Sequence, residues 1–204
     1  MEYYELHPVT PQLRYINKAV EVLRNGGVII YPTDTVYGIG CDIFNKEALE
    51  RVYDIKHEAG TKLFSFICPD LKDIAKYAKV SDYAYKSMKR HLPGPYTFVL
   101  PAAKEVPKKL WSNRNTVGIR VPNHAIAILL AKELGNPIIS TSATKRNGEP
   151  LYDPLEIQAI FNSQVDLMLA AGALEGVPSS IIDLSGDSAE VIREGAGDVS
   201  AFVV

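Results

Sequence analysis

The residues from Tyr31 to Gly38, with the sequence YPTDTVYG, decide how the rest of this chain is interpreted. They follow a short β-branched and aromatic run, Val28 to Tyr31, and Pro32 has no amide N–H for a sheet ladder, so we expect a strand to end there. The loop beyond it carries three hydroxyls and a carboxylate, and its glycines allow close backbone approach to a ligand (Thr33, Asp34, Thr35, Tyr37, Gly38 and Gly40). Such a loop either binds a ligand or satisfies its own backbone as a turn.

Length and composition place the chain among proteins with a substantial core. It has 204 residues, of which 47% are apolar, enough for one large or two small domains. No run of about 18 apolar residues is present, so we expect no membrane span. The first residues, Met1 to Glu5, lack the regions of a signal peptide, and two cysteines, Cys41 and Cys68, cannot build a disulfide framework. These features predict a cytoplasmic protein with reduced thiols.

The charges are unevenly distributed although the net charge is only −2. The segment from Lys79 to Arg120 contains nine basic and two acidic residues, whereas the segment from Glu149 onward contains ten acidic residues and one arginine. Aromatic residues accompany the basic segment, and this combination suits a nucleotide or RNA (Tyr83, Tyr85, Tyr96 and Trp111). We therefore expect three cations to contact RNA phosphates (Lys108, Lys109 and Arg114). The alternative is that these long side chains only solvate helix faces.

Hydrophobic periodicity predicts helices interleaved with strands. We expect helices from Thr10, as N-cap, to Gly26, and then at 45–56, 70–77, 81–91, 123–135 with Asn123 as N-cap, and 153–161. We expect strands at 28–31, 63–68, 96–100, 116–121, 137–142, 167–169, 180–184 and 190–192. The interleaving predicts a single α/β domain spanning 1–204, and several crossovers are too short for regular helix packing, which favours a mixed sheet.

Several common catalytic motifs are absent. The sequence contains no GxxxxGK[ST] and no GxGxxG, and its four histidines show no zinc-ligand spacing. What remains is a set of hydroxyls and cations near predicted strand ends (Thr35, Lys56, Thr116, Arg120, Ser140, Ser142 and Arg193). Ligands of α/β proteins usually bind beyond strand ends, and an arginine can fork onto a carboxylate or phosphate. The alternatives are that Arg120 forms a surface ion pair and that Ser142 caps a helix.

Four motifs together resemble the YrdC/YciO-like family, whose best-understood members are threonylcarbamoyl-AMP synthases. In order and spacing they are YPTDTVYGIG at 31–40, PGPYTFVL at 93–100, TVGIRVP at 116–122 and STSA at 140–143. The resemblance covers nearly the whole chain. It implies a single α/β domain with a twisted sheet and a positively charged concave cavity. It also implies an enzyme that joins L-threonine, bicarbonate and ATP, with Mg²⁺, into threonylcarbamoyl-AMP and pyrophosphate.

The resemblance also assigns roles to individual residues. Thr35 and Arg120 match positions that hold threonine, and Lys56 and Ser142 match catalytic positions. The nucleotide side would comprise Lys56, Lys62, Thr116, Ser140, Ser142 and Arg193. A downstream complex would then pass the threonylcarbamoyl group to an adenosine of tRNA, which places the protein in tRNA modification.

Two positions depart from the synthase pattern of Lys-x-Arg and Ser-x-Asn. Here the pairs read Lys56-His57-Glu58 and Ser142-Ala143-Thr144, which looks more like the YciO branch. Glu58 puts an anion where a polyphosphate should lie, and Lys62 would partly compensate for it. The alternative function is therefore a non-catalytic protein that binds tRNA, other double-stranded RNA or the ribosome through the same basic cavity.

Overall fold

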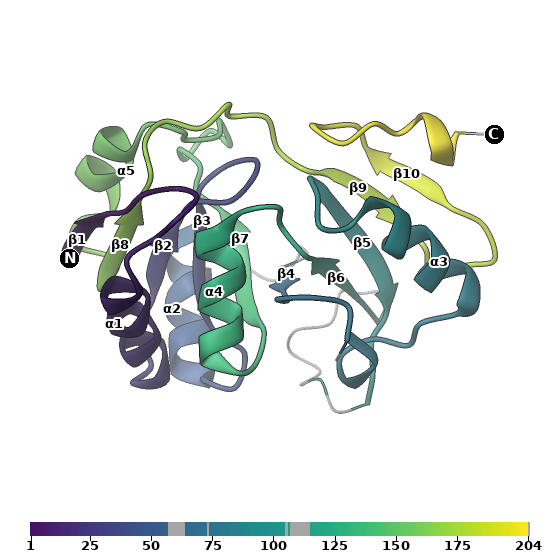
Figure 1. The fold of residues 1–204 in the computed structure, drawn as a ribbon, viewed down its shortest axis with the longest axis horizontal. Helices are drawn as coiled ribbons and strands as arrows, with labels where there is room; N and C mark the ends of the chain where they lie inside the picture. The colour runs from purple at the N-terminus through teal and green to yellow at the C-terminus, as the bar shows by residue number, and fades with distance from the viewer. Residues whose placement is uncertain (57–63, 73, 105, 107–114, 204) are drawn as a thin grey trace.

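The computed structural model describes residues 1–56, 64–72, 74–104, 106 and 115–203. Within them, ten strands form one mixed sheet in the order β1-β8-β2-β3-β7-β4-β6-β5-β9-β10. The strands are β1 (Glu2–Glu5), β2 (Ile29–Tyr31), β3 (Gly38–Asp42), β4 (Ser65–Ile67), β5 (Tyr96–Pro101), β6 (Thr116–Arg120), β7 (Ile138–Ser142), β8 (Leu167–Ala170), β9 (Ser180–Asp183) and β10 (Glu190–Arg193). The N-terminal and C-terminal strands lie at opposite edges of the sheet (Figure 1). The expectation of a single α/β domain with a mixed sheet is confirmed.

Helices cover both faces of the sheet. They are α1 (Leu13–Arg24), α2 (Lys46–Lys56), α3 (Asp82–His91), α4 (Ala125–Leu134) and α5 (Pro154–Phe161), with short 3₁₀ turns at Ile74–Lys76 and Ser200–Phe202. In Figure 1, α1 and α4 lie in front of the central strands and α2 lies behind them. The buried side chains form two clusters, one for each face: Ile16 and Leu130 pack with Ile138, whereas Leu49 and Val52 pack with Ile139. This alternation along β7 is the pattern of a strand buried on both sides.

A row of small residues crosses the middle of the sheet. Gly40 pairs with Ser140, Ser140 pairs with Ser65, and Ser65 pairs with Gly118 across four adjacent strands. Directly paired residues point to the same face. The two serines of this row line a hollow there, whereas the Tyr31 ring lies over Gly40. A Cβ atom added to Gly40 would meet the Ile139 carbonyl oxygen at 2.8 Å, so the glycine is needed for close strand packing. Arg120 and Ser142, two residues beyond Gly118 and Ser140, share the hollowed face.

Several element boundaries differ from the sequence-based expectation. Thr10 does not cap the first helix, which begins after Gln12, because the Thr10 amide and hydroxyl both bond to the His7 ring. Asn123 is not the N-cap of α4, since its amide N–H donates to Asp34 and His124 takes that position. Of the expected helix at 70–77, the described residues contain only the 3₁₀ turn at Ile74–Lys76. Strands β1 and β3 were not expected.

Two further expectations concern membrane and redox behaviour. None of the helices in the described parts of the chain combines the length and apolar character needed to cross a membrane. Cys41 and Cys68 are both buried free thiols, as expected from their number. Burial raises the pKa of the Cys41 thiol to about 12, which keeps it protonated and unreactive.

Candidate functional site

A cavity of about 200 Å³ opens on the hollowed face of the sheet. It gathers five of the residues that the sequence pointed to, from three strands and the end of α2 (Lys56, Arg120, Ser140, Ser142 and Arg193). Further hydroxyls complete the wall (Thr33, Ser65, Thr97, Thr141, Thr144 and Ser179). The described lining contains three cations and no carboxylate. Such a lining favours an anionic ligand with many hydrogen-bond acceptors.

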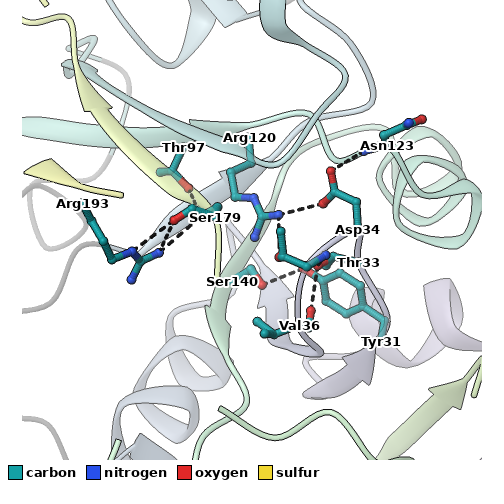
Figure 2. Close-up of polar contacts among 11 residues, drawn as sticks. Tyr31, Thr33, Asp34, Val36, Thr97, Arg120, Asn123, Ser140, Ser179 and Arg193 are labelled. Atoms are coloured by element: carbon teal, nitrogen blue, oxygen red, sulfur yellow. Dashed lines mark hydrogen bonds and ion pairs between the residues drawn. The ribbon is translucent and has the colours of Figure 1, made fainter. Parts of the chain in front are cut away.

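Arg120 is buried at the base of this cavity in an ion pair that the sequence did not reveal. Its Nη2 donates to Asp34 Oδ1 at 2.9 Å and to Thr35 Oγ1 at 3.1 Å, and the side chains of Arg120 and Asp34 are only 7% and 10% exposed. The other carboxylate oxygen, Asp34 Oδ2, accepts from the Asn123 amide at 2.9 Å. Figure 2 shows Arg120 between Asp34 on one side and Ser179 on the other. The surface ion pair considered from sequence is therefore a buried one.

The Nε atom of Arg120 is a guanidinium donor without a partner among the described residues. The Nε atom is also buried. Burial lowers the pKa of Arg120, while the Asp34 carboxylate acts in the opposite direction and favours the charged form. A ligand carboxylate at this donor would satisfy a buried polar group that is otherwise left unpaired, which is costly in a protein interior.

Arg193 supplies a second cation at the opposite end of the cavity. Its Nε and Nη2 donate to the Ser179 carbonyl oxygen at 3.1 and 2.7 Å, and Ser179 Oγ lies 2.8 Å from Thr97 Oγ1 (Figure 2). Ser179 is neutral, and none of the described carboxylates forms an ion pair with Arg193. Burial lowers the pKa of Arg193, and the charge of Arg120 lowers it further. An anion between the two arginines would relieve this repulsion.

Ser140 lies on the floor with its hydroxyl oriented by a buried tyrosine. Tyr31 Oη donates to Ser140 Oγ at 2.7 Å, which leaves the serine's own proton for an acceptor in the cavity (Figure 2). Burial raises the pKa of Tyr31, so it stays protonated and acts as the donor. The sequence singled out Ser140 but gave no signal for this role of Tyr31.

Lys56 lies at the rim, where α2 ends. Its Nζ donates to the Ser142 carbonyl oxygen at 3.0 Å and also to the Thr144 hydroxyl. Thr144, one of the two departures from the synthase pattern, therefore lies in the cavity wall and holds the ammonium group of Lys56. Asn45 caps this helix through Oδ1 and the Ala48 amide, as expected from sequence.

The other residues singled out from the sequence lie away from the described cavity lining, have their polar groups bonded elsewhere, or lie outside the described residues. The Thr35 hydroxyl accepts a hydrogen bond from Arg120, and Thr116 is buried at the opposite end of β6 from Arg120. Neither threonine belongs to the described cavity lining. Tyr37 lines the cavity, but its hydroxyl bonds to the Gly172 carbonyl and the Ala171 amide. Four predicted residues and Glu58 lie outside the described residues (Lys62, Lys108, Lys109 and Arg114), and their roles stay predictions.

A magnesium ion would have few protein ligands here. Among the described residues, no group of three or more His, Cys, Asp or Glu side chains is placed to hold a metal ion. Asp34, which pairs with Arg120 of the cavity lining, is taken up by Arg120 and the Asn123 amide. Mg²⁺ is often bound mainly by substrate phosphates and water, so an Mg²⁺ ion brought by a phosphate ligand would not need such a group of side chains.

Comparison with known proteins identifies relatives over the full length of the fold. YciO of Escherichia coli is 43% identical over 204 residues, which is 99% of each chain, and its crystal structure superposes with a TM-score of 0.95 over 100% of both. A threonylcarbamoyl-AMP synthase of Coxiella burnetii is 37% identical over 157 residues, covering 76% of this chain and 83% of the synthase.

A structure of P. abyssi Sua5 complexed with L-threonine matches with a TM-score of 0.90 at 25% identity, covering 96% of this chain and 58% of Sua5. The family model Sua5_yciO_yrdC, which carries the description "Telomere recombination", matches residues 21–195. This match covers most of the chain and agrees with both comparisons of whole proteins. The chain therefore belongs to the Sua5/YciO/YrdC family.

Proposed function

We propose that the protein is a threonylcarbamoyl-AMP synthase-like nucleotidyltransferase that acts in tRNA modification. Its substrates are L-threonine, bicarbonate and ATP, and its products are threonylcarbamoyl-AMP and pyrophosphate. The observation that carries the proposal is the cavity in which Arg120, Arg193 and Lys56 converge without a lining carboxylate. Relatives named threonylcarbamoyl-AMP synthase, and a Sua5 structure with threonine, support the same activity.

In the proposed reaction the two arginines of the cavity bind different substrates. Arg120 holds the threonine carboxylate, because its Nε is a buried donor without an acceptor. Arg193 and Lys56 bind phosphates, assisted by the hydroxyls of Ser140 and Ser142. The threonine nitrogen takes up bicarbonate to form a carbamate with loss of water. A carbamate oxygen then attacks the α-phosphorus of ATP, and pyrophosphate leaves.

This reaction needs no protein nucleophile. Holding the carbamate and the α-phosphate in line removes an entropic barrier, and fixed cations stabilise the charge that develops on the phosphate oxygens. Lys56 and Ser142 carry the proposed catalytic role, since both lie at the cavity rim close to each other. Mg²⁺ would supply further charge neutralisation when it arrives with ATP. A separate complex would transfer the product's acyl group to tRNA.

We predict that ATP with Mg²⁺ binds this cavity and that Arg193→Gln weakens binding about tenfold or more. The substitution removes a charge-assisted hydrogen-bond donor from the phosphates, and such bonds contribute roughly 1.5–3 kcal/mol. Titration calorimetry measures the effect. Arg90→Gln, an exposed arginine on α3 outside the cavity, is the matched control and should bind ATP like the wild type. The absence of ATP binding at millimolar nucleotide would contradict the proposed synthase activity and favour the RNA-binding alternative.

A further inference from the structure

A second cavity of about 530 Å³ adjoins the first. It lies between the end of α2, the turn at 144–148 and the end of α5, and we call it the annex. Its described lining is Ile55, Lys56, Thr144, Lys145, Arg146, Asn147, Gly148, Ile160, Phe161 and Gln164. Lys56, Thr144 and Gly148 line both cavities, so the contact between Lys56 and Thr144 forms part of the wall between them. The annex falls within the usual size range of small-molecule sites, roughly 300–1,000 Å³.

The turn that forms one wall of the annex is firmly held. The Lys145 amide donates to the Glu149 carbonyl at 2.8 Å, and the Gly148 amide donates to the Lys145 carbonyl at 3.0 Å. Gly148 adopts a φ of +87°, a conformation that favours glycine. The Lys145 ammonium reaches Glu156 on α5 at 2.9 Å and Glu149 at 3.5 Å, which ties the turn to the helix opposite. The annex is therefore a built cavity rather than a gap between independent loops.

Its polar groups suit a flat heterocycle. Asn147 uses its Oδ1 to accept from the Glu149 amide, which leaves the two amide hydrogens as donors. Gln164 uses its Nε2 to donate to the Ile160 carbonyl, which leaves Oε1 as an acceptor. A donor and an acceptor of this kind match the edge of a nucleobase, which presents both. The apolar wall next to them includes Ile160, which is 39% exposed and would be covered by a bound ring.

Its charge suits a phosphate. Lys145 is neutralised by the two glutamates that hold it, whereas Arg146 is exposed and forms no ion pair with the described carboxylates. None of the described lining residues is acidic. An arginine beside an apolar wall and two amides combines a phosphate binder with a base-binding surface.

We propose that the annex is a second nucleotide-binding site, separate from the one proposed for ATP. It takes a nucleoside 5′-phosphate unit, with the phosphate at Arg146 and the base against Ile160 and between the amides of Asn147 and Gln164. The unit is either a free nucleotide or one residue of a polynucleotide, since both present the same groups. Because Lys56 belongs to both cavities, a molecule in the annex lies directly beside the site of the proposed chemistry.

The test titrates AMP into the wild type and three single variants of the full chain: Arg146→Gln, Gln164→Ala and the control Arg90→Gln. We expect the wild type and Arg90→Gln to bind two molecules of AMP per chain. Arg146→Gln and Gln164→Ala should each weaken one of them about tenfold or more. Arg193→Gln should weaken the other. A photoreactive azido-AMP should crosslink to the end of α5, and this label should be lost in Arg146→Gln.

Further measurements distinguish a free nucleotide from a polynucleotide and define the results that would overturn the proposal. If a short oligoadenylate depends on Arg146 more strongly than AMP does, the occupant is a polynucleotide; equal dependence indicates a free nucleotide. The proposal is overturned if Arg146→Gln binds AMP like Arg90→Gln, or if inorganic phosphate competes as well as AMP, because the site would then recognise only an anion. Threonine-dependent pyrophosphate formation is measured separately, so loss of this proposal leaves the proposed synthase activity standing.

Discussion

Replacing Arg120 by leucine is expected to abolish threonine binding and to lower the free energy of unfolding by about 3–5 kcal/mol. The stability loss follows from burial: Asp34 is only 10% exposed, and without Arg120 its carboxylate would stay in the interior without a cationic partner. The binding loss follows from the removal of the donor that we assign to the threonine carboxylate. Calorimetry with L-threonine and chemical denaturation measure the two effects separately.

Two further variants separate the structural role of Arg120 from its binding role. Arg120→Lys keeps a charge near Asp34 but loses the planar fork, so threonine affinity should fall about tenfold or more while stability falls less than in Arg120→Leu. A double variant, Asp34→Leu with Arg120→Leu, removes both charges and should recover much of the lost stability without regaining threonine binding. Arg120 is purely structural if Arg120→Lys lowers the melting temperature and leaves threonine affinity unchanged.

The second large effect is a gain of activity from restoring the synthase pattern. Glu58→Arg combined with Thr144→Asn should raise threonine-dependent pyrophosphate formation about tenfold or more over the wild type. The charge reversal should dominate, because at the position that the resemblance gives Glu58 it turns repulsion of a polyphosphate into attraction, and Coulomb interactions in a partly enclosed cavity exceed their size in bulk water. Thr144→Asn alone should lower the activation free energy by only about 1 kcal/mol, since it exchanges one neutral hydrogen-bond partner of Lys56 for another.

Controls for this gain test charge and position independently. Glu58→Gln should give an intermediate rate, because it removes the repulsion of a polyphosphate without adding attraction. Glu21→Arg makes the same charge reversal on an exposed face of α1, where Glu21 pairs with Lys18, and should leave the rate unchanged. If the double variant folds and binds ATP like the wild type but shows no gain, another residue or another substrate distinguishes this protein from the synthases.

Local sequence signals predicted most of the elements but not the contacts that complete the site. The strand ending at Pro32, the helix capped by Asn45 and the strand carrying Ser140 all follow from nearby residues, and the structure places them as expected. Strand β3 was missed because its glycines, Gly38 and Gly40, are typical of a loop. Only the structure shows that they lie against Ser140 and Ile138 of the neighbouring strand.

The buried ion pair between Asp34 and Arg120 shows most clearly which contacts local sequence signals do not predict. Asp34 and Arg120 are 86 residues apart, and no residue near either of them predicts that their side chains form a buried ion pair. The same holds for Ser179, whose carbonyl binds Arg193, and for Thr144, whose hydroxyl binds Lys56. Sequence reasoning therefore found the types of side chain that the cavity needs, whereas their mutual distances depend on how the strands are ordered in the sheet.

The most direct test of the proposed activity follows the carbon of bicarbonate into the product. Purified protein is incubated with ATP, Mg²⁺, L-threonine and ¹³C-labelled bicarbonate, and mass spectrometry and a pyrophosphate assay follow the products, with each substrate omitted in turn. We predict a labelled species that contains threonine, one carbon from bicarbonate and AMP, formed together with pyrophosphate only when all three substrates are present. Pyrophosphate that forms without threonine, or a complete mixture that binds ATP and threonine yet never incorporates the label, would contradict the proposed activity.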